Sequence, residues 1–313
     1  MNIRKPKTIA DLKLELMDYN KYFEYVKFEF GNLIQRQMED NVKRESEIQR
    51  FIEKYPIAIS GLLGELPAGY NIAGMTLISQ PRLKTYQRDR QPDFLIITGN
   101  SLELYFNFIE IESPAKKFFH PKKLQVTKDF QEAVNQIREW TAFDRKDLDN
   151  YSDDIIDTVF RDNSDITKRK SRHYTFSLIY GDSSEIEDKN DQSFKRLLDG
   201  FFPNKDMIFS TYSRILKYMT PHYPLMSIIR RAGNSRFEAL GMVPWKNYKV
   251  DEWQNYHLIY GKEKVVNECG WLSDIDKKKL INTMKELDSL PASEIWKRDD
   301  LTTSEFSDSM TDD

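Results

Sequence analysis

Three acidic residues lie at the ends of two predicted strands in QPDFLIITGNSLELYFNFIEIESPA, residues 91–115. Asp93 opens the first strand, and Glu110 and Glu112 close the second. Glu110 and Glu112 share one face because strand side chains repeat every two residues. The three carboxylates would repel one another unless a hard cation lay between them. The spacing therefore predicts a divalent-metal site where the two strands pair.

Two helix residues could extend this site. Glu45 falls about 60° from the centre of the apolar stripe of a helix predicted at 32–54, so it leans toward the core. An acid at a helix border is more often solvated or capping than functional, and both readings of Glu45 stay open. Gln136 borders the apolar face of a helix predicted at 124–143 and could orient a water or a substrate oxygen.

The elements that must position these residues follow from apolar periodicity and from Gly and Pro punctuation. Through residue 180 their order is helix, three strands, helix, strand. We expect helices at 1–30, 32–54, 124–143, 192–201, 212–219 and 275–287, a loop at 61–74, and strands at 75–79, 94–97, 104–111, 174–180, 206–209, 236–242 and 256–260. The segment 144–172 is expected to be a helix extension followed by a surface loop.

Composition excludes several classes of protein. The single cysteine, Cys269, and four scattered histidines argue against a disulfide framework and a structural zinc site, and fit a reducing, cytoplasmic location. Mean hydropathy is −0.66, and no apolar run is long enough for a membrane helix or a signal peptide. The net charge of −3 includes an acidic tail at 299–313, which we expect to be solvated.

Two basic segments flank the acids, RLKTYQRDRQ before them and KKFFHPKK after them. The first is either a solvated loop or a loop that contacts phosphate, and the sequence favours neither reading; the second is basic and aromatic and leads into the next helix. If they contact DNA, they position the duplex without reading its sequence. Their basic residues are Arg82, Lys84, Arg88, Arg90, Lys116, Lys117, Lys122 and Lys123.

Several of these motifs occur together in a known family. The pieces ESEIQRFIEKYP, PDF, FIEIESPAKKFF, AVNQIREW, YTFSLIYG and STYSRIL resemble the SduA-type nuclease domain of Shedu anti-phage defence proteins over residues 41–220. These belong to the PD-(D/E)XK nuclease superfamily. The resemblance implies an α/β fold with an αβββαβ core, a mixed sheet flanked by helices, with N-terminal helices and a C-terminal accessory region.

The resemblance also implies roles for the candidate residues. Asp93 and Glu110 would be metal ligands for Mg²⁺ or Mn²⁺, Glu45 the helix acid that joins them, and Gln136 the helix glutamine. Glu112 stands where the superfamily has the lysine of its E-x-K motif. A substitute cation could come from Lys116, Lys117 or Lys84; otherwise Glu112 could help to hold a second ion.

The implied function is metal-dependent endonuclease cleavage of double-stranded DNA in anti-phage defence. DNA would contact Lys84, Arg88, Arg90, Lys116 and Lys117, and the chain would form a homo-oligomer, a dimer or tetramer, with no membrane association. The expected division is an N-terminal oligomerisation segment, a nuclease domain, an accessory region and a disordered tail, at 1–40, 41–220, 221–298 and 299–313. Two alternatives remain: a catalytically inactive nuclease fold that binds DNA or a protein, and a structural protein whose acids only form salt bridges.

Overall fold

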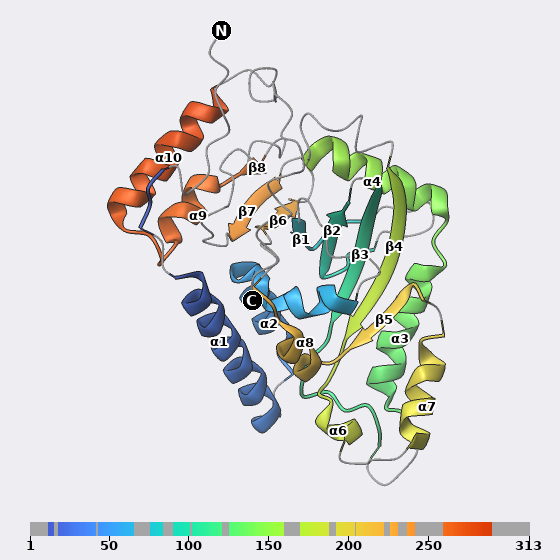
Figure 1. Ribbon diagram of the computed structural model, residues 1–313. Helices are drawn as coiled ribbons and strands as arrows, with labels where there is room; N and C mark the ends of the chain where they lie inside the picture. Colours follow the sequence, from blue (N-terminus) through green and yellow to red (C-terminus); the bar gives the residue numbers. More distant parts are fainter. Residues whose placement is uncertain are drawn as a thin grey trace, which may run out of the picture.

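The chain forms an α/β structure with helices on both faces of one sheet (Figure 1). The computed structural model describes residues 12–15, 18–41, 43–65, 76–83, 90–100, 102–120, 125–159, 170–187, 192–203, 205–221, 226–230, 237–241 and 259–289. Its helices are α1 (Tyr19–Glu39), α2 (Glu45–Lys54), η1 (Pro56–Glu65), α3 (Lys128–Thr141), α4 (Arg145–Val159), α6 (Ser184–Glu187), α7 (Gln192–Phe201), α8 (Tyr212–Tyr218), α9 (Lys262–Glu268) and α10 (Asp274–Asp288). Its strands are β1 (Thr76–Ser79), β2 (Phe94–Gly99), β3 (Glu103–Ile111), β4 (Ser171–Ile179), β5 (Met207–Ser210), β6 (Met226–Arg230), β7 (Phe237–Gly241) and β8 (Ile259–Tyr260).

The strands form one mixed sheet in the order β5-β4-β3-β2-β1-β6-β7-β8. β2 pairs antiparallel with β1 and β3, whereas β4 runs parallel to β3 and β5. The expected α/β class with a mixed sheet flanked by helices is therefore confirmed. β6 extends the sheet by pairing parallel with β1, so strands from the predicted accessory region join the predicted core. The domain boundaries stay a prediction, and the tail at 299–313 lies outside the described residues.

The central strands carry the register that matters for the candidate site. Every residue of β2 is buried, as expected of an apolar strand covered on both faces. In the antiparallel pairing of β2 with β3, Phe94 lies opposite Ile109. Continuing that register by one residue brings Asp93 and Glu110 together at the end of the pair.

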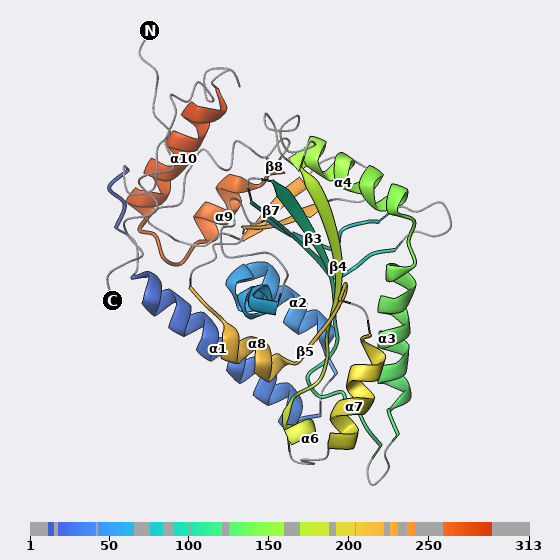
Figure 2. The ribbon, with the colours of Figure 1, turned by 45° about the vertical axis from the view of Figure 1, so that its right-hand side comes forward.

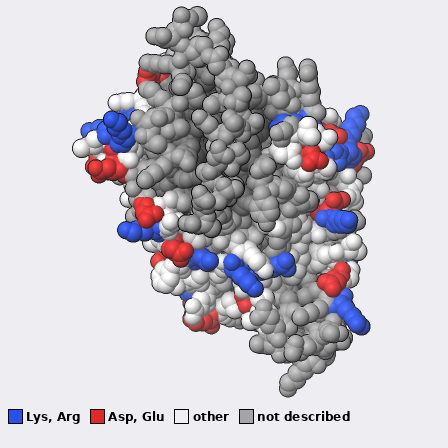
Figure 3. Space-filling model, in the orientation of Figure 1, with Lys and Arg blue, Asp and Glu red and all other residues white. Residues whose placement is uncertain are grey.

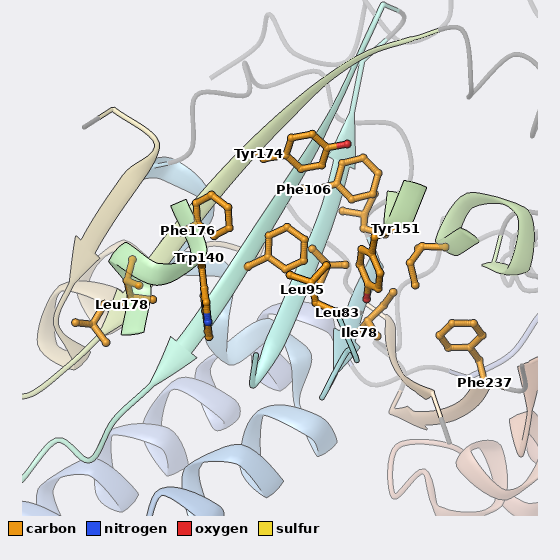
Figure 4. Packing of buried hydrophobic residues seen from close by; sticks show 14 of the residues in the cluster. Ile78, Leu83, Leu95, Phe106, Trp140, Tyr151, Tyr174, Phe176, Leu178 and Phe237 are labelled. Atoms are coloured by element: carbon orange, nitrogen blue, oxygen red, sulfur yellow. The ribbon is translucent and has the colours of Figure 1, made fainter. Parts of the chain in front are cut away.

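Different helices cover the two faces of the sheet (Figure 2). α1, α2, η1 and α8 pack on one face, where Phe94, Ile109 and Ile111 join their core. α3 and α4 pack on the other face against alternate residues of the same strands. Figure 4 shows this second core, with Trp140 of α3 near Phe176 and Leu178, and Tyr151 of α4 near Leu95 and Phe106. Glu110 belongs to this face, because side chains two residues apart in a strand point the same way.

The predicted boundaries of the first two helices are wrong. One helix was expected over 32–54, but α1 continues to Glu39 and α2 begins at Glu45. The chain turns between them, where Asn41 adopts a positive φ of 50° that no regular helix allows. Residues 1–11 of the expected first helix lie outside the described part of the chain. Glu45 is therefore the first residue of a helix and projects from its end rather than from its side.

The expected loop at 61–74 is also partly wrong. Pro56–Glu65 form the 3₁₀ helix η1, which is largely buried, and residues 66–75 are outside the description. Gly61 permits a close approach between η1 and α8, because a Cβ there would lie 2.0 Å from the carbonyl oxygen of Ile215. The sequence also did not separate α4 from α3, and it missed β6 and α9. No helix in the described ranges is long and apolar enough to cross a membrane.

Candidate active site

Asp93 is fixed at the junction of β2 and β3. Pro92 precedes it, and β2 begins at the next residue, Phe94. One oxygen of its carboxylate, Oδ2, accepts a hydrogen bond from the backbone N–H of Ile111 at 2.9 Å. The carbonyl of Asp93 accepts from the N–H of Gln80 at 2.8 Å, which ties it to the end of β1. Sheet pairing on both sides therefore places this acid.

Glu110 lies beside Asp93 and receives one partner from helix α3. Its Oε1 accepts a hydrogen bond from Nε2 of Gln136 at 2.6 Å. Its Oε2 is buried and has no hydrogen-bond partner. A buried carboxylate oxygen without a donor is costly, so this atom is suited to meet a cation or to carry a proton. The structure thus brings together three residues that the sequence singled out.

The two carboxyl groups disturb each other's ionisation. Burial raises the pKa of Asp93 to about 6, against the opposing effect of the Ile111 N–H. Burial, and after it the negative charge of Asp93, raise the pKa of Glu110 to about 9. The pair therefore retains a proton at neutral pH when no cation is present. A divalent ion would replace that proton and relieve the repulsion.

Glu45 and Glu112 form a second acidic pair with a lysine between them. Nζ of Lys116 lies 2.8 Å from Oε1 of Glu45 and is also ion-paired with Oε2 of Glu112. The side chains of Lys116 and Glu112 are 16% and 14% exposed, against 42% for Glu45. Glu45 reaches this position because it begins α2, whose positive dipole end favours an acid.

Beside this lysine, the pKa values of the two acids shift in opposite directions. Burial works against the charge of Glu45, but hydrogen bonds from Glu112 and Lys116 leave the pKa of Glu45 below its usual value. Burial raises the pKa of Glu112 to about 7, assisted by the hydrogen bond and charge of Glu45 and opposed by Lys116. The pKa of Lys116 is itself raised by these acids, despite its own desolvation. The lysine therefore stays charged near neutral pH.

Helix α1 and strand β3 hold this second pair through a buried amide. Gln37 is 1% exposed, and its Nε2 donates to the carbonyl of Arg44 at 2.9 Å, immediately before Glu45. Its Oε1 accepts the hydroxyl of Ser113 at 3.4 Å, immediately after Glu112. On the other side, the hydroxyl of Tyr212 donates to the backbone carbonyl of Glu112 at 2.6 Å. Three helices and a strand end thus meet around the acids.

The sequence reasoning missed these supporting residues. Gln37 was hidden inside an amphipathic helix, where a glutamine normally faces solvent. Ser113 directly follows the acidic strand end and Tyr212 lies in STYSRIL, but neither motif by itself predicts a role for these two residues. Pairing a buried Gln with a strand-end Ser needs tertiary contacts that no local pattern encodes.

The predicted DNA-contacting residues are only partly described. Lys117 is exposed, whereas Lys116 points into the acid cluster. Arg90 forms a salt bridge with Glu139 of α3 and is half-buried, so it does not project freely. Lys84, Arg88, Lys122 and Lys123 lie outside the described residues. On the described part of the face in Figure 3, basic and acidic side chains are interspersed.

Asp93 and Glu110 could together hold a divalent cation. Within the described ranges, no group of three or more His, Cys, Asp and Glu side chains is arranged to hold a metal as it stands. Asp93 and Glu110 nonetheless offer two hard oxygen donors, one of them the unpartnered Oε2 of Glu110. Mg²⁺ is commonly held by one or two carboxylates and several waters, so a two-acid site suffices.

The fold and the site define an α/β protein with an acid cluster at the end of the central strands of a mixed sheet. Residues 42–216 match the family described as Shedu protein SduA, C-terminal. This match covers more than half of the 313 residues, and the chain belongs to this family. A search of curated protein sequences found no match. Family membership supports a role in anti-phage defence.

Proposed function

We propose that the chain is a metal-dependent endonuclease of the PD-(D/E)XK type that hydrolyses phosphodiester bonds of double-stranded DNA in anti-phage defence. The observation that carries this proposal is the buried pair Asp93–Glu110 with the unpartnered Oε2 of Glu110. Structural acids are normally neutralised by bases, and no basic side chain is among the contacts described for these two acids. The order helix α2, strands β1–β3, helix α3 and strand β4 supports the superfamily assignment.

Asp93 and Glu110 would hold Mg²⁺ or Mn²⁺, which when bound polarises a phosphoryl oxygen and lowers the pKa of water. Gln136 keeps Glu110 turned toward Asp93 through its 2.6 Å hydrogen bond. The ammonium of Lys116 supplies positive charge beside the developing phosphorane. In the reaction, a water oxygen bonds to phosphorus, the bond from phosphorus to the leaving oxygen breaks, and the proton of the water passes to that oxygen.

DNA would lie across the end of the sheet that carries the acids. Lys117 is an exposed base on the loop that follows β3 and the acids, and Lys84 and Arg88 would extend the contact. These are phosphate contacts and give affinity without sequence preference. The proposed homo-oligomer would use the outer side of α1, where the side chains of Tyr25 and Phe28 are 41% and 65% exposed.

Cleavage of plasmid and linear duplex DNA in Mg²⁺, Mn²⁺ or EDTA tests the proposal. Wild type should cut only with a divalent ion, and Asp93→Ala and Glu110→Ala should each abolish cutting. Glu132→Ala is the matched control, because Glu132 is a 62% exposed acid of α3 paired with Lys128. An inactive wild type that still binds duplex DNA would instead support the catalytically inactive binding module. Cutting that survives both substitutions would refute the assigned site.

A further inference from the structure

Lys116 supplies the positive charge that Glu45 and Glu112 would otherwise have to obtain from a bound cation. Its ammonium is 2.8 Å from a carboxylate oxygen of Glu45 and is ion-paired with Glu112. Its side chain is only 16% exposed, whereas the adjacent Lys117 is exposed. Most lysines lie in solvent, so a lysine drawn inward between two acids indicates a defined role.

The backbone that carries Lys116 is tied to the sheet and to α3. The N–H of Lys116 donates to the carbonyl of Ser113 at 3.1 Å, which closes a tight turn after β3. The carbonyl of Lys117 accepts the hydroxyl of Thr127 at 2.7 Å and that of Tyr180 at 3.3 Å. These bonds fix the two residues in place, so Lys116 is held inward by its backbone as well as by its ion pairs.

The residues after Lys117 are anchored more firmly still. Phe118 and Phe119 are buried, and the carboxylate of Glu185 accepts both of their N–H groups, at 2.9 and 3.2 Å. Gly181 has a φ of +58°, and a Cβ there would lie 2.9 Å from the carbonyl oxygen of Lys116. Only glycine fits this close approach without strain. The end of β4 therefore presses directly on the loop that presents the lysine.

The two halves of the cluster differ in the charged groups that accompany the acids. Asp93 and Glu110 lack a basic partner among the contacts described for them, and one oxygen of Glu110 is unpartnered. Glu45 and Glu112 share the ammonium of Lys116. A divalent ion entering between Glu45 and Glu112 would meet this ammonium at close range and be repelled. An ion between Asp93 and Glu110 would not have to displace an ion-paired ammonium.

We infer that the site binds one divalent ion, at Asp93 and Glu110, and that the ammonium of Lys116, held by Glu45 and Glu112, serves as its built-in second cation. This inference rests on the proposed function and specifies its metal stoichiometry. It assigns Glu45 to positioning the lysine rather than to the metal. It also selects Lys116, among the candidate lysines, as the replacement for the missing lysine at position 112.

Metal binding measured without DNA tests the inference by calorimetric titration with Mn²⁺. Wild type should bind one ion per chain, and its cleavage rate should rise with Mg²⁺ concentration with a Hill coefficient near 1. Lys116→Met keeps the length of the side chain and removes the charge. It should bind a second ion at the freed acids, raise the Hill coefficient above 1, and slow cleavage at least tenfold. Lys285→Met, at a 60% exposed lysine of α10, is the matched control and should keep one ion and the wild-type rate.

A rescue variant makes the test independent of stability. Lys116→Met combined with Glu112→Lys returns an ammonium to the strand end, and it should restore one-ion binding and most of the cleavage rate. Two ions in a wild type that cuts DNA would overturn the inference and leave the proposed function intact. If Lys116→Met kept one bound ion and the wild-type cleavage rate, the inference would likewise be overturned and the proposed function would stand. A wild type that binds no ion and does not cut would overturn the proposed function together with the inference.

Discussion

The two halves of the acid cluster solve the same electrostatic problem in different ways. Asp93 and Glu110 are buried against each other, and the carboxylate contacts described for them come from a backbone N–H and an amide. Glu45 and Glu112 lie just beyond them with Lys116 between. The pKa of Glu110 rises to about 9, whereas Lys116 helps to hold that of Glu45 below its usual value. Like charges brought together in a fold must be neutralised, either by a group of the chain or by a ligand.

Replacing one acid in each half should produce the largest contrast. Glu110→Gln removes a proposed ligand, and we expect cleavage to fall on the order of 10³-fold because the metal no longer binds tightly. Glu112→Gln keeps that ligand and leaves Lys116 paired with Glu45, so we expect a loss of about tenfold. Single-turnover cleavage at saturating Mg²⁺ measures both, with Glu132→Gln as the exposed control. Equal losses in the two variants would remove the distinction between the halves.

The second-largest effect concerns the pH dependence of metal binding, which should depend on the Asp93–Glu110 half of the cluster. A metal can use both oxygens of Glu110 only after its proton leaves, and its pKa is about 9. Between pH 6, near the pKa of Asp93, and pH 9, we expect Mn²⁺ affinity to rise by up to about tenfold per pH unit. Titration in buffers of different ionisation heat should show proton release, and the release should disappear in Glu110→Gln. Affinity that does not change with pH would contradict the shared proton.

Without metal, the free energy of unfolding should depend on pH because of the proton that Glu110 retains. Folded Glu110 keeps its proton up to a pKa of about 9, whereas the unfolded chain loses it near its ordinary value of 4.5. The folded state therefore binds more protons in this window, and the free energy of unfolding must fall as pH rises through it. We expect a loss of roughly 2 kcal/mol between pH 6 and 9, measured by denaturant unfolding in EDTA. Glu110→Gln should flatten this slope; a stability that rises with pH would contradict it.

The smallest expected effect concerns the backbone that presents Glu112. Tyr212 is fully buried and donates to the carbonyl of Glu112. Tyr212→Phe should lower the free energy of unfolding by about 1–2 kcal/mol, because a buried carbonyl loses its donor. Tyr218→Phe is the control, since Tyr218 is 51% exposed and should be neutral. Thermal unfolding compares the two, and equal effects would show that the hydroxyl of Tyr212 is not needed there.

Much of the site was predictable because its residues lie at element ends. The alternation in β3 put Glu110 and Glu112 on one face, and Pro92 marked the start of the strand after Asp93. The apolar face of α3 placed Gln136 at its border, and the structure joins it to Glu110. The bounds of α1 and α2 could not be predicted well, because the break at Asn41 carries no Pro or Gly signal.

Sequence alone therefore determined the strand-end acids, including the glutamate at position 112, and the succession of α2, β1–β3, α3 and β4, because local periodicity and residue type encode them. Only the tertiary structure decided which cation accompanies which acid. Lys116 is chosen over Lys117 by the contacts of Gly181 and Glu185, which come from the end of β4 and from α6. Gln37 reaches the site from α1, more than seventy residues before Ser113. Such contacts depend on how separate elements pack, and that information is absent from any short stretch of the chain.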